Sequence, residues 1–288
     1  MRDAGLVRAA RRRIRRILHR GAALALRLRS RRYPLEAGAV TLVFAPHQDD
    51  GTLGCGGLIL LKQRMRLAVR IAYLTDGSHS HPGHPILSPA DIAKLRRSEA
   101  EAAAGVLGVG PSALFFLDAP DGRLDRLGPA ERDTLVGKIA AVVSEVRPDE
   151  ILLPYRKDRS SEHEAGFTLV MEGIARSGAQ PRVLEYPIWS WWDPRALIKP
   201  LLGSGRVWRA GIADCLEQKL LALRCYASQI EPTPPWADPV LPRSFLSYFS
   251  SGEEFFFEID AHPFAVRKDA AAKQREAGPP ASQDSSRP

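Results

Sequence analysis

Residues 43–57 read VFAPHQDDGTLGCGG, and this short stretch indicates both a fold and a site. The segment opens as an apolar run, places His47, Asp49 and Asp50 close together, and continues into a glycine-rich turn. Adjacent carboxylates repel one another unless a positive group offsets their charge. A divalent cation would do so, which makes the end of this apolar run a candidate metal site.

Outward from this stretch, apolar runs of strand length alternate with segments of helical length. Expected strands cover residues 39–46, 68–76, 113–118, 149–155, 182–189 and 253–260, and expected helices cover 55–65, 88–109, 129–148, 162–178 and 213–229. Ser88 followed by Pro89 is typical of a helix start. Strict alternation up to residue 189 predicts parallel strands joined by helical crossovers. The sequence therefore predicts an α/β fold with a mostly parallel sheet and helices on both faces.

The charge of the chain is concentrated at one end. The net charge is +8, but residues 1–32 hold 12 arginines and the single acid Asp3, a charge of +11, which leaves −3 for the remainder. A slightly acidic body argues against nucleic-acid binding by the main domain. The segment 1–32 is interpreted either as a basic amphipathic helix on an anionic membrane surface or as a solvated basic extension.

The remaining composition sets the broad class of the protein. Three widely spaced cysteines without a CxxC pair fit neither a disulfide framework nor a structural zinc site, so a reducing compartment is expected. Apolar runs are too short for a transmembrane helix. We expect one main domain over residues 38–264, followed by a polar, disordered tail over 265–288.

Reactive residues follow three of the expected strands. In open parallel sheets, ligands bind outside the carboxyl ends of the strands, so PHQDDG, TDGSHSHPGH and PYRKDRSSEHEAG should converge. His47, one of the two aspartates and His163 form a plausible set of three ligands for a catalytic metal, with the other aspartate as general base. The competing interpretation is that these histidines are ordinary hydrogen-bonded residues, since HxDD alone is short.

Other motifs allow two interpretations each. The glycines of LGCGG, residues 53–57, could cradle a phosphate, but the preceding acids would repel it, and close helix packing is favoured. The histidines of HSHPGH, residues 79–84, are expected to line the cleft. The tryptophans of PIWSWWDP, residues 187–194, form either an aromatic wall for a sugar face or a packed loop anchor.

The ordered series of motifs resembles the PIG-L (LmbE-like) N-acetylglucosaminyl de-N-acetylase family. APHQDDGTLGCGG is similar to that family's AHPDDE signature with its glycine-rich turn, YLTDGSHSHP to its TDG segment, and RRSEAEAAAGVLGV to its R-x-x-E-A helix. LDAPDG and ALRCYASQ also resemble family segments, and PYRKDRSSEHEAG occupies the place of the second metal motif. The resemblance covers roughly residues 40–230.

This resemblance implies a Rossmann-like fold and zinc-dependent removal of an acetyl group from an N-acetylglucosamine-type sugar conjugate. By position, the metal would be bound by His47, Asp50 and His163, and Asp49 would be the general base. Zn²⁺ is the implied ion, although such a site can also take Fe²⁺. The positions implied to contact the sugar are Arg96 and Asp121.

The sequence departs from the family pattern at two positions. Gly51 stands where the signature has a carboxylate, and Ser160 stands where HPDH has a histidine that stabilises the oxyanion. Loss of one oxyanion donor costs about 10² to 10³ in rate. Ser160 itself or His81 is expected to take over that role. The alternative function is therefore that of a catalytically weak or inactive family member, which acts as a sugar-binding or membrane-associated scaffold protein.

The expected location of the protein is cytoplasmic. Residues 1–32 are expected to make peripheral contact with the inner face of the membrane.

Overall fold

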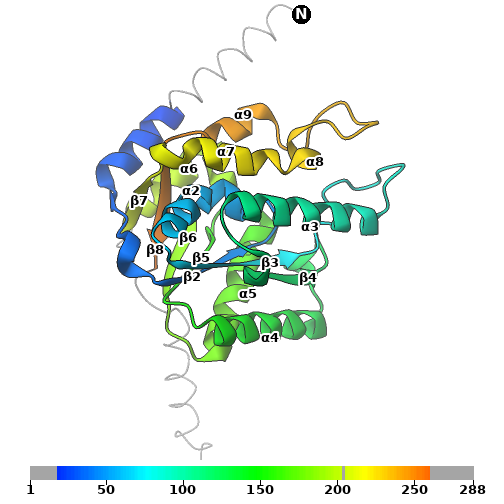
Figure 1. Ribbon diagram of the computed structural model, residues 1–288, viewed down its shortest axis with the longest axis horizontal. Coiled ribbons are helices and arrows are strands. Elements are labelled where there is room, and N and C mark those ends of the chain that lie inside the picture. Colours follow the sequence, from blue (N-terminus) through cyan, green and yellow to red (C-terminus); the bar gives the residue numbers. More distant parts are fainter. Residues whose placement is uncertain (1–17, 203–204, 260–288) are drawn as a thin grey trace, which may run out of the picture.

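The computed structural model describes residues 18–202 and 205–259 (Figure 1). The expected alternation is present from residue 40 to residue 186. Its elements are β2 (Val40–Ala45), α2 (Asp50–Arg64), β3 (Ala68–Thr75), α3 (Pro89–Val106), β4 (Leu114–Ala119), α4 (Pro129–Val146), β5 (Glu150–Pro154), α5 (Ser161–Ser177) and β6 (Arg182–Tyr186). The expected tail, residues 265–288, lies outside the described residues.

The strands of the described chain form one eight-stranded sheet in the order β1-β7-β8-β6-β5-β2-β3-β4. Strand β2 pairs in parallel with both β3 and β5. The chain thus leaves β2 toward β3 and β4, and later returns on the other side through β5 and β6. This reversal is the switch point at which the loops after β2 and β5 diverge to leave a crevice.

Helices cover both faces of the sheet, so the predicted fold class is confirmed. Figure 1 shows α2, α3 and α7 (Leu216–Arg224) on one face and α4 with α5 on the other. Two clusters of buried side chains correspond to these two layers: Val43 and Leu58 belong to one, and Phe44 and Ile139 to the other. Neighbouring residues of β2 therefore point into opposite cores, which explains why this strand is apolar almost throughout.

The C-terminal part differs from the expectation in two respects. Strand β7 (Val207–Gly211) was not anticipated, and it pairs antiparallel with β8 (Glu253–Glu258), which also pairs antiparallel with β6. The single helix expected over 213–229 is divided into α7 and α8 (Ala227–Ile230). Two further short helices are α6 (Pro194–Ile198) and α9 (Arg243–Leu246).

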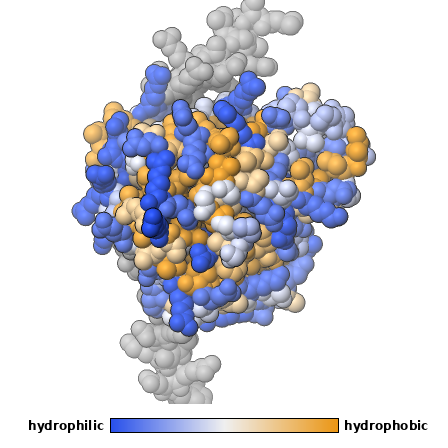
Figure 2. All heavy atoms as spheres, viewed as in Figure 1, coloured by the Kyte–Doolittle hydropathy of each residue, from blue (hydrophilic) through white to orange (hydrophobic). Residues whose placement is uncertain are grey.

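Part of the basic N-terminal segment packs against the domain. Residues 18–29 are helical, Ala22 and Leu26 of this helix are buried in the core, and the short strand β1 (Arg31–Arg32) pairs with β7. Figure 2 shows hydrophilic and hydrophobic residues side by side over this region. No helix of the described residues has the length and apolar character needed to cross a membrane.

Candidate metal centre and adjacent cavity

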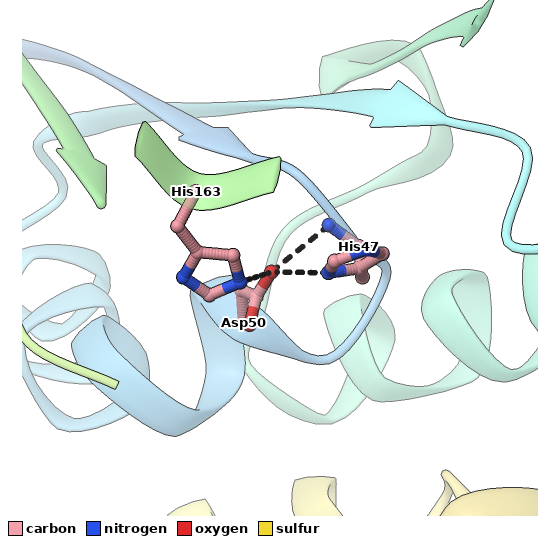
Figure 3. A group of neighbouring side chains, drawn as sticks. All are labelled: His47, Asp50 and His163. Atoms are coloured by element: carbon pink, nitrogen blue, oxygen red, sulfur yellow. Dashed lines mark hydrogen bonds and ion pairs between the residues drawn. The ribbon is translucent and has the colours of Figure 1, made fainter. Parts of the chain in front are cut away.

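The switch point brings the predicted ligands together. His47 and Asp50 follow β2, and His163 lies in the first turn of α5, after β5. Oδ2 of Asp50 lies 3.2 Å from Nδ1 of His47 and 3.3 Å from Nε2 of His163, so one carboxylate oxygen faces both imidazoles (Figure 3). The structure therefore groups His47, Asp50 and His163 as potential ligand donors within 4.8 Å of one another.

Local hydrogen bonds fix the turn that carries Asp50. The backbone N–H of His47 donates to Oδ2 of Asp50 at 2.9 Å, which closes the turn. The hydroxyl of Tyr226 donates to the carbonyl oxygen of Gln48 at 2.7 Å, and the Gln48 side chain donates to the carbonyl oxygen of Thr75 at 2.8 Å. Segments far apart in the sequence thus hold the HQDD turn in place.

A buried carboxylate, Asp158, orients His163. Nδ1 of His163 lies 2.8 Å from Oδ2 of Asp158, and both residues are fully buried. Asp158 also accepts backbone N–H groups from residues 188–190, so its own position is fixed. Because this contact places an imidazole proton on Nδ1, Nε2 is the nitrogen that faces Asp50; it is buried and makes no hydrogen bond beyond that ionic contact at 3.3 Å.

Two further carboxylates face His47 from the other side. Nε2 of His47 lies 2.8 Å from Oε2 of Glu162 and 3.2 Å from Oδ1 of Asp121. These three residues form a second group of potential metal donors. A histidine that donates one ring N–H to a carboxylate can bind a metal through its other nitrogen. Nδ1 of His47 points toward Asp50, so Glu162 and Asp121 are suited to orient His47 for the first group.

The electrostatics of the cluster suit a divalent cation. Burial lowers the pKa of His47, but hydrogen bonds to Asp121, Asp50 and Glu162 outweigh it and raise this pKa well above its usual value. Burial likewise opposes charge on His163, yet Asp50 and Asp158 raise its pKa to about 9. The site thus favours positive charge. Two imidazole nitrogens, Nδ1 of His47 and Nε2 of His163, and a carboxylate oxygen of Asp50 form a donor set that fits a zinc-type or ferrous ion.

Asp49, next to Asp50 in the sequence, pairs with Arg96. Oδ1 of Asp49 accepts a hydrogen bond from Nη2 of Arg96 at 2.9 Å, and Nη1 of Arg96 donates to Glu99 at 3.0 Å. Burial opposes the charge of Arg96, but these two carboxylates raise its pKa. Glu99 in turn accepts hydrogen bonds from the backbone N–H and hydroxyl of Ser228. Arg96 thus fixes Asp49 beside the ligand group.

A cavity of about 200 Å³ opens beside the cluster. Its polar wall includes Asp49, Asp50, Arg96, Asp121, Glu162, His47, Gln48, His79 and Ser80. Its apolar wall consists of Leu53, Ile188, Trp189, Val240, Leu241 and Phe245. Of the sequence-predicted residues, Arg96 and Asp121 thus line the cavity, although both are occupied by ionic contacts with Asp49, Glu99 and His47.

The structure places the two expected oxyanion donors elsewhere. Ser160 caps the N-terminus of α5, where its hydroxyl oxygen faces the His163 N–H at 3.5 Å. The ring of His81 stacks on Trp236 at 5.3 Å, and its Nε2 lies 3.2 Å from the Thr233 hydroxyl. Neither side chain is among the residues that line the cavity, whereas His79 is.

The glycines after the HQDD turn pack closely inside α2. A Cβ atom at Gly54 would lie 2.4 Å from the Tyr186 ring, and one at Gly57 would lie 2.5 Å from Ile212. These glycines therefore allow the helix to approach its neighbours, which is the interpretation that the sequence favoured over a phosphate cradle.

Sequence reasoning did not single out Asp158 and Glu162. Both lie in PYRKDRSSEHEAG, five residues and one residue before His163. The available signal was the presence of acids within a histidine-bearing strand-end loop, because metal-binding histidines commonly donate their second ring N–H to a carboxylate.

Comparisons with known proteins identify a family match and similar folds. Residues 42–174 match the family model of PIG-L, described as GlcNAc-PI de-N-acetylase. The N,N′-diacetylchitobiose deacetylase of Pyrococcus horikoshii is similar in structure, with a TM-score of 0.61, 21% identity, and coverage of 81% of this chain and 87% of that chain. A teicoplanin deacetylase in a zinc-inhibited form has a TM-score of 0.54 and 16% identity, with coverage of 77% of this chain and 99% of that chain.

A structure with different chemistry is also similar. The 4-carboxy-2-hydroxymuconate hydratase of Pseudomonas putida KT2440 has a TM-score of 0.54, 19% identity, and coverage of 85% of this chain and 91% of that chain. One fold therefore hosts more than one reaction, and the function has to be argued from the site.

Proposed function

We propose that this chain, which carries a PIG-L family domain over residues 42–174, is a metal-dependent hydrolase that removes the acetyl group from an N-acetylglucosamine-type sugar conjugate. The observation that carries the proposal is the buried Nε2 of His163, which makes no hydrogen bond and faces Oδ2 of Asp50 at 3.3 Å, with Asp49 next to Asp50 in the same turn. The deacetylases among the similar structures favour this reaction over hydration of a carbon–carbon double bond.

Each residue of the cluster has a distinct role in this proposal. His47, Asp50 and His163 would hold a divalent cation, which when bound would act as a Lewis acid toward the acetamide carbonyl and lower the pKa of a water molecule. Asp49 takes the proton of the attacking water and passes it to the departing amine. Arg96 holds one oxygen of Asp49 at 2.9 Å, which leaves the other oxygen to accept that proton.

The cavity also limits how the oxyanion of the tetrahedral intermediate can be stabilised. His79 is the imidazole among the cavity-lining residues outside the proposed ligand set. We infer that His79, rather than Ser160 or His81, supplies the protein's hydrogen bond to that oxygen. This assignment replaces the histidine that the family motif has at position 160.

Metal analysis combined with acetate release tests the proposal. The purified protein should hold about one divalent ion per chain, and Asp50→Ala and His163→Ala should each lose it. The parent should release acetate from the methyl glycoside of N-acetylglucosamine. Asp49→Asn keeps an oxygen that can accept from Arg96 and should keep the metal, but should lose at least about 10²-fold in rate because it cannot accept a proton.

The outcomes separate the alternatives. Metal retained by both ligand variants would contradict the ligand assignment, and full activity in Asp49→Asn would contradict the choice of base. A parent that holds metal but releases no acetate from any N-acetylated sugar conjugate would favour the sugar-binding or scaffold alternative.

A further inference from the structure

The cavity beside the metal cluster has two walls of opposite character. The polar wall carries the groups that the proposed reaction uses. The apolar wall combines residues from α2, from the turn after β6, from the segment leading into α9 and from α9 itself, and none of them takes part in the proposed chemistry. Apolar surface that lines a reaction cavity is a binding surface for apolar groups.

Contacts with the rest of the domain position parts of this apolar wall. The Trp189 ring stacks on the Phe245 ring with 4.6 Å between centroids and an interplanar angle of 21°. The backbone N–H of Trp189 donates to Asp158 at 2.9 Å, so the wall is tied to the carboxylate that orients His163. The N–H of Leu241 donates to the carbonyl oxygen of Gln229 at 2.8 Å. These contacts connect the wall to the loop that carries Asp158 and to α8.

The acetyl group alone is too small to account for this surface. It offers one methyl group, whereas the wall presents six large apolar side chains. Val240, at the edge of the cavity, remains 38% exposed, so the wall extends to the solvent. A sugar face could cover one aromatic ring, but the aliphatic residues Leu53, Val240 and Leu241 would remain uncovered.

We propose that the substrate is an acylated amino sugar carrying an apolar group of several carbons, alkyl or aryl, which packs against Trp189, Val240 and Leu241 while the amide lies at the metal cluster. This inference rests on the proposed function for the amide and adds the chemical class of the attached group. That group has two potential sources, the aglycone of the sugar and an acyl chain longer than acetyl.

Paired substrates test the proposal and identify the source. The values of kcat/KM are compared for methyl and octyl glycosides of N-acetylglucosamine, and for methyl glycosides bearing N-acetyl and N-octanoyl groups, all below micellar concentrations. We expect at least a tenfold preference for the apolar member of one pair, which corresponds to burial of about two methylene groups. No preference in either pair would overturn the proposal and assign the wall to the sugar face.

Two matched variants locate the effect. Val240→Asp places a charge at the edge of the wall on an already exposed residue, and should reduce the preference at least fivefold. Leu221→Asp alters a leucine on α7 that is 51% exposed and does not line the cavity, and should leave the preference unchanged. An equal effect of both variants, or of neither, would contradict the assignment to this wall.

A binding measurement keeps the inference separate from the proposed reaction. Octyl β-glucoside has no acetamide, and calorimetric titration of the parent should detect its binding, with a weaker affinity in Val240→Asp and no binding of methyl β-glucoside at the same concentration. If none of the four glycosides were deacylated but octyl β-glucoside bound as described, the result would support the apolar site and contradict the proposed reaction. Absence of octyl glucoside binding would count against the apolar site.

Discussion

At the scale of single residues, Asp158 and Glu162 each contact one ring nitrogen of a histidine in the proposed metal site, which leaves the other nitrogen facing Asp50. Glu162 lies 2.8 Å from Nε2 of His47, and its other oxygen accepts the Leu124 N–H at 3.0 Å, so it is fixed in place. Glu162→Gln should therefore weaken metal binding by about 10- to 100-fold without abolishing it, as expected for a residue that orients a ligand. Competition with a chelator at pH 7 measures the affinity.

A control carboxylate on the same helix isolates this effect. Glu172 pairs with Arg132 at the surface, with 34% of its side chain exposed, and Glu172→Gln should leave the metal affinity unchanged. Complete loss of the ion in Glu162→Gln would instead make Glu162 a direct ligand, as in the second group of donors around His47.

Glu185 provides a residue-scale test of stability against pH. It lies fully buried in β6, and burial raises its pKa from 4.5 to about 7, although Arg156, whose side chain is 41% exposed, lies 3.2 Å away. Because the folded pKa exceeds the unfolded one, the contribution of this group to stability is complete below pH 4.5 and is lost as the pH rises through about 7.

Glu185→Gln should remove this dependence. The amide oxygen can still accept the Arg156 N–H, as Oε1 of Glu185 does at 2.8 Å. Urea unfolding at pH 5 and pH 8 should show a free energy of unfolding that falls more in the parent than in the variant, by up to about 3 kcal/mol. Parallel profiles for the two proteins would show that Glu185 stays ionised when folded.

The proximity of some residues could be predicted from the sequence. His47, the two aspartates and His163 follow strands of a parallel sheet, so the rule about strand ends grouped them, and the family resemblance selected Asp50 as the expected ligand. The contacts of Asp158, Glu162 and the Arg96–Asp49 pair depend on which loops meet in space. Spacing along the chain does not contain that information.

At the scale of elements, Ser160 has two conceivable roles, the N-terminal cap of α5 and a donor to the oxyanion, and one variant distinguishes them. Its hydroxyl oxygen caps the helix and lies outside the cavity lining. Ser160→Ala should lower the free energy of unfolding by about 0.5–1 kcal/mol, the low end for a cap because the contact is 3.5 Å long. Deacetylation should stay within about threefold of the parent, whereas an oxyanion donor would cost about 10² or more.

The cap of α3 gives a matched comparison for this variant. Ser88 accepts the Asp91 N–H at 3.2 Å and forms a capping box, so Ser88→Ala should lower stability by a similar or larger amount and leave activity unchanged. A drop of 10²-fold in activity confined to Ser160→Ala would restore Ser160 as a catalytic group.

Helices and strands could be predicted from the sequence where the spacing of apolar residues and the positions of Pro, Gly and Ser indicate the same boundaries. The strands and helices from residue 40 to residue 186 follow apolar runs bounded by Pro, Gly and Ser, and their bounds agree within a few residues except that α2 begins five residues earlier. Strand β7 is short, carries Arg209 and lies near the sheet edge, so it lacks a clear apolar pattern.

The break between α7 and α8 coincides with Tyr226, whose hydroxyl reaches the HQDD turn. A tertiary contact thus overrides the helical pattern there.

At the scale of the whole molecule, the sheet order explains why one crevice collects the reactive loops. Strands β3 and β4 lie on one side of β2, and β5 and β6 on the other, so the loops after β2 and β5 separate at their carboxyl ends. Strand β8 then adds antiparallel, and the chain between β7 and β8 returns over the crevice to supply Val240, Leu241 and Phe245. The alternating pattern predicts the crevice, but only the three-dimensional path of the later segment gives it an apolar wall.

The basic N-terminal segment sets the last whole-molecule prediction, which concerns membranes. The helix at residues 18–29 buries Ala22 and Leu26, while Leu24 and Leu28 are 56% and 75% exposed among arginines. Exposed leucines beside arginines are suited to an anionic bilayer, where each basic residue near the surface contributes about 1 kcal/mol. We predict that the full chain sediments with vesicles containing anionic lipid at low salt, and that 0.5 M salt releases it.

Substitution is the suitable test, because deleting this helix would expose the core that Leu26 fills. The double variant Leu24→Ser, Leu28→Ser should bind anionic vesicles at least about tenfold more weakly, since two apolar side chains no longer enter the interface. Leu221→Ser, on α7 and 51% exposed, should bind like the parent. Equal sedimentation with neutral and anionic vesicles, or binding that persists in the double variant, would show that neither the charge nor the leucines of this helix direct the protein to a membrane.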